Sequence, residues 1–434
     1  MFQFVIQGGK KLSGEIKVNS AKNSAVSILC ATAMIKGKTT LVDVPVIEDV
    51  KRIIEILKSI GIKVRWTGNH ELEIVNTGKL LLDKLDKAAF MRIRSGLLFV
   101  GSLSAVLNNF SLPKSSGCKL GKRTVNPYKL AFEHMGVKVR ETESAYIITR
   151  KNLKEAEFTM YESGDTATES VIMAAALGKG TTTVHFASSN YMTQDLCYFL
   201  TRAGAKIEGI GTSTLKITGV SGLNAVEDYS IMPDPIEAMS FIAIAITTGS
   251  RLKVTGCPID FLRLEMEKLR VMGQKYKTSK TYKSKNGKFD LIDIEIIPSN
   301  LKALPDKIYG RPYPGLNIDH LPLFIPILTQ AKGSTLVHDW VYENRAIYYT
   351  ELNNLGANIM LHDPHRVTVT GITKLTPAEI MCPPALRPSL NLLICMLAAE
   401  GKSILRNAYA IDRGYEDIVK RLTTIGADIK RVEE

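Results

Sequence analysis

Apolar positions recur along the chain in two patterns that follow one another. After short β-branched runs such as residues 39–42, apolar side chains return every three to four positions, as they do between Ile53 and Ile60. This is the period of a helix with one buried face. Residues 63–75 and 138–150 instead alternate apolar and polar side chains, which indicates hairpin strands. The chain is therefore predicted to be of mixed α/β class.

These patterns form one repeated plan of turn, short strand, helix and hairpin. Four clear copies begin near Gly37, Gly178, Gly333 and Gly401, and two weaker copies complete the series. A glycine follows each helix, where a left-handed residue ends the helix at least cost. Six copies in 434 residues predict two domains of three strand-helix-hairpin repeats each, with interior helices surrounded by sheet. The active site is then expected in the interdomain cleft.

Composition narrows the class of partner. The formal net charge of +13 favours anionic partners, which include nucleic acid and phosphorylated small molecules. The densest basic run, residues 275–288, holds six lysines and lies where a hairpin loop is expected, so we interpret it as a solvated surface rather than a nucleic-acid site. We find no helix-turn-helix or aromatic-basic motif, and the prediction is no nucleic-acid partner.

Cysteine spacing and hydropathy exclude further classes. The six cysteines are far apart, with no CxxC pair and no histidine cluster, which argues against disulfides and a metal site. No apolar run reaches the roughly 18 residues of a membrane helix, and the start does not resemble a signal peptide. We therefore predict a cytoplasmic protein with no membrane partner.

Two short stretches carry candidate chemistry. Lys22 and Asn23 stand where a strand pattern becomes a helix pattern near Ser24, and a helix start with a lysine attracts anions; a plain surface turn is the alternative. Cys118 lies in a loop rich in glycine, serine and basic residues. Cationic neighbours favour the thiolate, although an inert free cysteine fits the local sequence as well.

Arginines and one aspartate complete the candidates. Arg92, Arg345, Arg387 and Arg413 are expected just before or within helix starts, and arginine grips carboxylate and phosphate bidentately. Each alone would more often be a surface ion-pair partner. Asp319 precedes an apolar helix, where an N-cap is the simplest role, and a general base is the alternative.

Several of these segments together resemble a known family. The segments GGKKLSGEIKVNSAKN, SLPKSSGCKLGKR, ENR, LRPS and AIDRGYEDI resemble the enolpyruvyl transferases of the UDP-N-acetylglucosamine 1-carboxyvinyltransferase type, a sister family of the 3-phosphoshikimate 1-carboxyvinyltransferases. The resemblance spans essentially the whole chain. It implies a transferase of peptidoglycan and cell wall synthesis that moves the enolpyruvyl group of phosphoenolpyruvate to the 3-hydroxyl of UDP-N-acetylglucosamine by addition and elimination. No cofactor is implied.

The resemblance also implies an organisation and residue roles. The fold would be two inside-out α/β domains, one of residues 23–228 and one of residues 1–22 plus 229–434, and substrate would close the cleft. The loop cysteine is the fosfomycin target in the family. The matching positions are Lys22, Arg123 and Arg413 for phosphoenolpyruvate, Cys118 for the loop thiol, Asp319 for the candidate base, Asn23 for a sugar contact, and Arg92, Arg345 and Arg387 for the cleft.

This sequence departs from the family at three segments, and the two that contain Asn126 and Asp165 help hold the uridine and diphosphate in the family. Asn126 and Ala385 stand where the family usually has aspartate, and Asp165 interrupts a Ser-Val-Gly-Ala-Thr segment. The cysteine loop is also about two residues longer. Two alternatives therefore stay open, an enolpyruvyl transferase for a different nucleotide or nucleoside acceptor and a non-catalytic paralogue that binds sugar nucleotides. Retention of Lys22, Cys118, Asp319 and Arg413 together argues against the paralogue.

Overall fold

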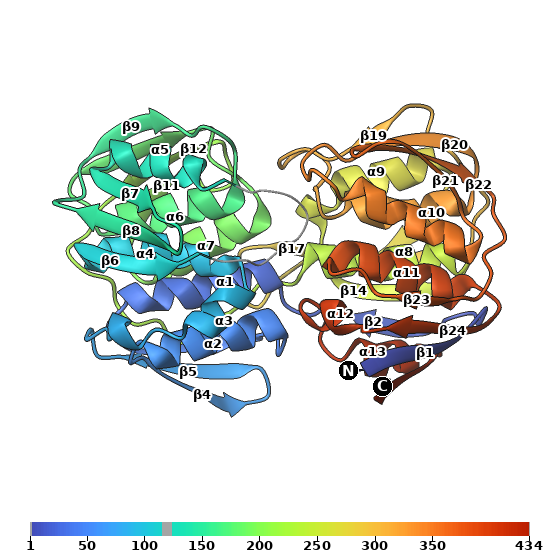
Figure 1. The fold of residues 1–434 in the computed structure, drawn as a ribbon, viewed down its shortest axis with the longest axis horizontal. Coiled ribbons are helices and arrows are strands. Elements are labelled where there is room, and N and C mark those ends of the chain that lie inside the picture. The colour runs from blue at the N-terminus through green and yellow to red at the C-terminus, as the bar shows by residue number, and fades with distance from the viewer. Residues whose placement is uncertain (1, 115–123, 434) are drawn as a thin grey trace. The chain divides into compact units, whose positions relative to one another are not determined.

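The computed structural model describes residues 2–114 and 124–433, drawn in Figure 1. Contacts between Cα atoms divide these residues into two compact units. The central unit consists of residues 20–114 and 124–232, and the terminal unit of residues 2–19 and 233–433. The chain thus passes from one unit to the other after residue 19 and again after residue 232.

The described part of the central unit holds three small sheets. Their strand orders are β13 (Tyr229–Ser230), β3 (Gly37–Val42), β5 (Glu71–Asn76), β4 (Lys63–Gly68); β6 (Asn109–Pro113), β8 (Ala145–Arg150), β7 (Val137–Glu141); and β11 (Lys206–Glu208), β12 (Thr214–Thr218), β10 (Thr181–His185), β9 (Ala156–Thr159). Two of them contain an antiparallel pair predicted from alternation, β4 with β5 and β7 with β8. Two of the sheets also contain a parallel pair, β13 with β3 in one and β9 with β10 in the other. Two of the three sheets are therefore mixed.

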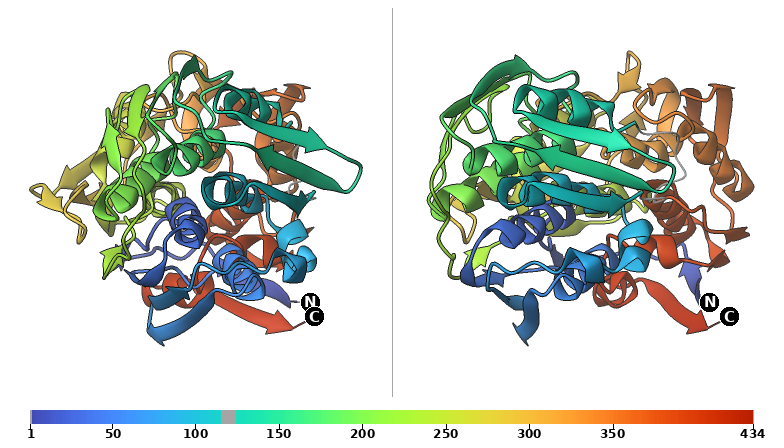
Figure 2. Two further views of the ribbon diagram at one scale, coloured as in Figure 1. Left: turned by 90° about the vertical axis from the view of Figure 1, so that its left-hand side faces the viewer. Right: turned by 60° about the vertical axis from the view of Figure 1, so that its left-hand side comes forward.

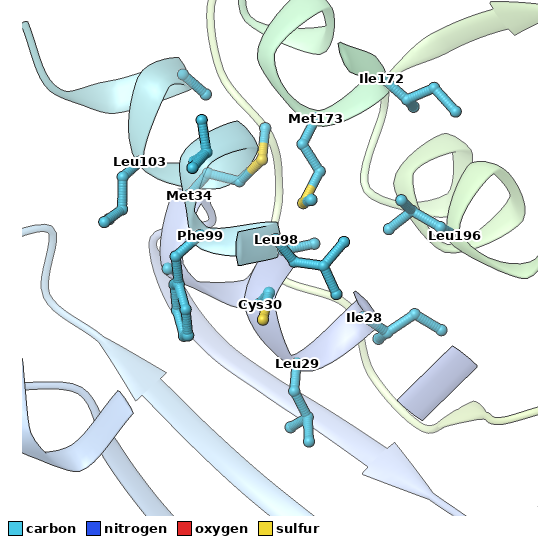
Figure 3. Packing of buried hydrophobic residues seen from close by; sticks show 14 of the residues in the cluster. Ile28, Leu29, Cys30, Met34, Leu98, Phe99, Leu103, Ile172, Met173 and Leu196 are labelled. Atoms are coloured by element: carbon cyan, nitrogen blue, oxygen red, sulfur yellow. The ribbon is translucent and has the colours of Figure 1, made fainter. Parts of the chain in front are cut away.

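Helices of the central unit are of two kinds. The buried ones are α1 (Lys22–Ala31), α4 (Phe99–Val106) and α6 (Asp165–Ala176). The amphipathic ones are α2 (Glu48–Ser59), α5 (Asn126–His134) and α7 (Tyr191–Arg202), and shorter turns are η1 (Thr32–Met34), η2 (Leu82–Lys84), α3 (Lys87–Arg92) and η3 (Ser95–Leu98). Helices apolar on every side must be covered on every side. Figure 3 shows Cys30 of α1 with Leu98, Phe99 and Met173 among the side chains of this core.

The described terminal unit also holds three sheets. Their strand orders are β23 (Glu379–Met381), β24 (Gly401–Arg406), β1 (Phe2–Gly8), β25 (Asp428–Glu433); β15 (Lys275–Thr278), β17 (Asp290–Ile297), β14 (Leu252–Pro258), β2 (Glu15–Lys17), with β16 (Tyr282–Lys283) on β17; and β18 (Leu301–Lys302), β20 (Ala331–His338), β22 (Arg366–Gly371), β21 (Asn358–Asp363), with β19 (Ile308–Tyr309) on β20. The strands β1 and β25 pair antiparallel. The two ends of the chain therefore share a sheet, as Figures 1 and 2 show.

Buried and peripheral helices recur in the terminal unit. The buried helices are α8 (Pro235–Thr247), α10 (Phe324–Thr329) and α11 (Leu386–Ala398). The others are η4 (Ile259–Phe261), α9 (Arg263–Val271), η5 (Leu321–Leu323), η6 (Ala346–Leu355), α12 (Tyr409–Asp412) and α13 (Ile418–Thr424). Every residue of α8 is buried, which places it at the centre of the packing in this unit.

One helix differs from the expectation. The pattern after Arg345 predicts an ordinary helix, but η6 is a 3₁₀ helix. Its buried side chains are Ala346, Tyr349, Leu352 and Leu355, at a constant spacing of three. A 3₁₀ helix has three residues per turn, so this spacing aligns all four on one face.

Other local expectations can be compared directly. The six helix-ending glycines, Gly61, Gly136, Gly204, Gly273, Gly356 and Gly426, all have positive φ, as predicted. The lysine-rich segment 275–288 is not a simple hairpin, because β15 and β16 each pair with β17. Within residues 2–114 and 124–433, no helix combines the length and apolarity needed to cross a membrane.

Candidate active site

Asp319 of the terminal unit lies between two arginines. It occupies the turn between β19 and η5. Arg345 Nη1 donates a hydrogen bond to its Oδ1 at 3.3 Å, and Arg387 Nη2 lies 3.6 Å from its Oδ2. The predicted N-cap role is wrong, since the residue that precedes η5 is His320 and no side chain caps this helix. The Asp319 carboxylate is instead engaged by side chains from two other elements.

The turn that carries Asp319 is anchored from α9. Glu265 of this helix accepts a hydrogen bond from the Asn317 backbone at 3.3 Å and lies 2.6 Å from the His320 ring nitrogen Nδ1. Asn317 in turn accepts from the Asp319 backbone N–H at 2.9 Å. Glu265 is buried, and it therefore holds the chain on both sides of Asp319. Sequence reasoning missed this residue, because nothing near it in the chain marks it.

Arg345 is buried within the same unit. Its guanidinium makes two hydrogen bonds to Asp339, of 2.6 and 2.8 Å, and a third to the Ile318 carbonyl at 2.5 Å. The Tyr349 hydroxyl also donates to Asp339, at 2.5 Å. Burial, together with the charge of Asp339, raises the pKa of Tyr349 well above its usual value, so the phenol stays protonated as a donor. Asp339 and Tyr349 were not among the predicted site residues.

Arg387 reaches Asp319 from the first turn of α11. Its Nη1 donates to the Tyr415 hydroxyl at 2.9 Å, and that hydroxyl lies 2.7 Å from Ser240 Oγ. Burial raises the pKa of Tyr415 to about 12. Arg413 directly follows α12, is partly buried, and belongs to the same unit. The structure therefore brings Asp319, Arg345 and Arg387 together and places Arg413 near Tyr415 in the chain.

The central unit carries Lys22, Asn23 and Arg92. Lys22 is the first residue of α1, two positions before the predicted start, and its Nζ lies 2.8 Å from the buried carboxylate of Asp49. Asn23 donates to the Tyr191 hydroxyl at 3.0 Å. Arg92 is exposed and ends α3, so its predicted position at a helix start is wrong. Cys118 and Arg123 lie outside the described residues.

The residues that depart from the family pattern lie at or directly before the starts of helices. Asn126 begins α5, and Ala385 directly precedes α11. Asp165 begins α6. Its two carboxylate oxygens accept hydrogen bonds from Ser188 Oγ at 2.5 Å and from Asn190 Nδ2 at 3.2 Å. An anionic side chain therefore occupies the positive end of the α6 dipole.

Metal ligands and reactive thiols are scarce in the described residues. No group of three or more His, Cys, Asp or Glu side chains there could hold a metal ion. The cysteines of the described ranges, Cys30, Cys197, Cys257, Cys382 and Cys395, are all buried. Burial raises the pKa of Cys382 to about 11, and that of Cys395 well above its usual value. These thiols are therefore poor nucleophiles at neutral pH.

The cluster in the terminal unit suits proton transfer next to an anion. A carboxylate can accept a proton, and arginines that flank it can also hold phosphate or carboxylate groups of a substrate. These groups match a reaction in which an anionic substrate is bound and a hydroxyl is deprotonated.

Comparisons with known proteins agree with this chemistry. Residues 6–422 match the family described as EPSP synthase (3-phosphoshikimate 1-carboxyvinyltransferase). The UDP-N-acetylglucosamine 1-carboxyvinyltransferase of Bacteroides thetaiotaomicron is 34% identical over 443 residues, which covers 100% of each chain. The enzyme of that name from Treponema denticola is 34% identical over 442 residues, with the same coverage.

Solved structures show the same fold. The enolpyruvyl transferase NikO from Streptomyces tendae superposes with a TM-score of 0.85 at 23% identity over 99% of each chain. EPSP synthase from Acinetobacter baumannii superposes with a TM-score of 0.76 at 18% identity over 100% of each chain. The mixed α/β architecture of this protein is therefore that of known enolpyruvyl transferase structures. By its sequence match over nearly all residues, the chain belongs to the EPSP synthase family of carboxyvinyltransferases, the enolpyruvyl transferases.

Proposed function

We propose that the protein transfers the enolpyruvyl group of phosphoenolpyruvate to the 3-hydroxyl of UDP-N-acetylglucosamine and releases phosphate. The observation that carries the proposal is the full-length likeness, at 33–34% identity, to enzymes named UDP-N-acetylglucosamine 1-carboxyvinyltransferase. Relatives and chain cover one another completely, so the likeness extends over every domain of those enzymes. The reaction would supply peptidoglycan synthesis.

The proposed reaction is an addition followed by an elimination. The acceptor oxygen bonds to C2 of phosphoenolpyruvate and loses its proton, while a proton is added to C3. The C2–O bond to phosphate then breaks and a proton leaves C3, which restores the double bond. We assign the acceptor proton to Asp319, because this carboxylate is held between Arg345 and Arg387. A positioned base of this kind contributes roughly 10²–10⁴-fold to a rate.

Cationic residues are proposed to bind the two anionic substrates. Lys22, Arg123 and Arg413 would hold phosphoenolpyruvate, and Asn23 the sugar. The contact of Lys22 with Asp49 supports the first role, because a hydrogen bond to the buried carboxylate fixes the position of the ammonium group. Cys118 would donate the C3 proton or act in product release. Arg92, Arg345 and Arg387 would surround the acceptor.

A different acceptor is the second candidate, and one observation favours it. Asp165 places a carboxylate at the start of α6, held by Ser188 and Asn190. In the family this segment helps to hold the uridine and diphosphate, and a fixed negative charge there would repel a diphosphate. An acceptor with less negative charge at this position would be preferred under this alternative.

Phosphate release from phosphoenolpyruvate tests both proposals. We expect release with UDP-N-acetylglucosamine and none with UMP, UDP-glucose or shikimate 3-phosphate. Release with another acceptor only would contradict the first proposal and support the second. An Asp165→Ala variant, matched by Asp290→Ala at the start of β17, where the aspartate side chain is 37% exposed, tests the role of the carboxylate at α6. If Asp165 limits nucleotide binding, its removal should lower the KM for UDP-N-acetylglucosamine, and Asp290→Ala should not.

A further inference from the structure

Two aspartates compete for one buried arginine. Arg345 is about 1% exposed in its side chain, as is Asp339, whereas the Asp319 side chain is 23% exposed. Arg345 binds Asp339 through two nitrogens at 2.6 and 2.8 Å, but reaches Asp319 through one nitrogen at 3.3 Å. The charge of Arg345 is therefore neutralised mainly by Asp339.

Asp339 is itself fixed by its surroundings. It directly follows β20, and its backbone N–H donates to the His365 carbonyl at 2.7 Å. The His365 ring lies 3.2 Å from the Asp339 carbonyl oxygen. On the carboxylate, Tyr349 of η6 adds a hydrogen bond to the oxygen that also accepts from Arg345 Nε. The buried Asp339 carboxylate thus links the end of β20, the 3₁₀ helix η6 and Arg345.

We propose that Asp339 is a positioning residue, which fixes the Arg345 guanidinium and takes up its charge so that Asp319 remains an effective base. The inference rests on the proposed function, in which Asp319 accepts the acceptor proton. Without the Asp339 charge, Asp319 would become the principal counter-ion of a buried arginine. Such a partner stabilises the carboxylate anion, lowers its pKa and weakens it as a base.

The charges around Asp319 come from several elements. Arg345 and Arg387 face its carboxylate directly, Asp339 and the ring of Tyr342 contact Arg345, and Glu265 with His320 holds its backbone. Among the contacts described above, the negatively charged groups that touch Arg345 are Asp339 and Asp319. Removal of Asp339 should therefore change the charge balance at Asp319 directly.

The test compares Asp339→Asn with the wild type in kcat, KM and pH profile. The asparagine keeps the shape but not the charge. We expect kcat to fall at least about tenfold, which is part of the roughly 10²–10⁴-fold contributed by a positioned base, while KM for phosphoenolpyruvate changes little. The acidic limb of the kcat profile should move to lower pH. Asp339→Glu, which keeps the charge, should recover part of the loss and restore that limb toward its original pH.

A second pair of variants covers the case in which Asp339→Asn does not fold. Tyr349→Phe removes the hydrogen bond that fixes the Asp339 oxygen shared with Arg345 Nε. Asp339 then holds Arg345 less firmly, so a smaller loss of kcat with the same direction of pH shift is expected. Tyr229→Phe is the matched control, because the buried Tyr229 hydroxyl donates to the buried Asp195 at 2.7 Å in the central unit. It should lower the melting temperature and leave the kcat profile unchanged.

The results separate this inference from the proposed function. Folded Asp339→Asn with wild-type kcat and pH profile would overturn the positioning role, as would Tyr349→Phe behaving like Tyr229→Phe. If the wild type releases no phosphate, the proposed function fails instead. The pKa of the Asp319 carboxyl, followed by 13C NMR and assigned with Asp319→Asn, then tests the positioning role alone. It should be lower in Asp339→Asn, or in Tyr349→Phe, than in the wild type.

Discussion

Asp319 is the residue on which the proposed chemistry depends most. Two arginines hold its carboxylate, and its backbone is fixed through Asn317 and Glu265. Chain position alone suggested an N-cap, because an acid before an apolar helix usually has that role. The arginines that changed this interpretation come from positions 26 and 68 residues further along.

Replacement of this carboxylate gives the first prediction. Asp319→Asn should lower kcat by roughly 10²–10⁴-fold, because the amide cannot accept the acceptor proton. The KM for phosphoenolpyruvate should stay within a few-fold of the wild type. Phosphate release measures both quantities, and thermal unfolding controls for stability. An unchanged kcat would exclude Asp319 as the base.

Cys118 gives the second prediction at this scale. The cysteines of the described ranges are buried, and burial raises the pKa of Cys395 and Cys382, so they should react slowly in the folded protein. We expect a thiol reagent to modify Cys118 first and fosfomycin to inactivate the wild type. Cys118→Ser should resist fosfomycin. Mass spectrometry of the modified peptide checks the site, and labelling elsewhere would contradict this prediction.

At the scale of elements, a buried carboxylate joins α7 to the segment after β13. Asp195 of α7 accepts hydrogen bonds from the Tyr229 hydroxyl and from the Met232 backbone, which directly precedes the passage to the terminal unit. Burial raises the pKa of Asp195 to about 7, whereas an aspartate in an unfolded chain titrates near 3.9. The folded state therefore favours the protonated form.

The raised pKa of Asp195 predicts how stability depends on pH. Since the folded pKa is the higher one, the stabilisation by protonated Asp195 is complete below about pH 4 and is lost as the pH rises through about 7. The free energy of unfolding of the wild type should therefore fall relative to Asp195→Asn over this range, by about 1.4 kcal/mol for each pH unit that separates the folded and unfolded pKa values. Urea unfolding of both proteins between pH 4 and 8 measures the difference. A constant difference would contradict the raised pKa, because all other groups titrate alike in both proteins.

For the whole molecule, the proposal assigns residues of both units to one substrate. Lys22 belongs to the central unit and Arg413 to the terminal unit. A ligand that binds only the folded protein stabilises it by about 2.7 kcal/mol at 100 times its Kd. We expect phosphoenolpyruvate with UDP-N-acetylglucosamine to raise the melting temperature, and Lys22→Ala and Arg413→Ala each to reduce the rise. If the rise in melting temperature is reduced in only one of the two variants, the residue replaced in the other variant does not bind substrate.

Local patterns were sufficient for much of this fold. Alternation predicted the paired strands β4 with β5 and β7 with β8, and the six helix-ending glycines adopt positive φ. These features depend on neighbours within a few positions, so their physical causes, side-chain periodicity and the freedom of glycine, are visible in the chain itself. The candidate residues were also visible, because cationic and acidic side chains at element ends are marked by sequence context and by the family resemblance.

Spatial proximity, by contrast, was decided by the tertiary structure. The pairing of β1 with β25 joins the two ends of the chain, and η6 takes the 3₁₀ form, which places its four buried side chains on one face. Asp339, Tyr349 and Glu265 entered the site only through folding. Their charges and hydrogen bonds act over a few ångströms, whereas Glu265 lies 54 residues before Asp319 in the chain. A sequence records which groups are present, but the energy of buried charges depends on which of them meet.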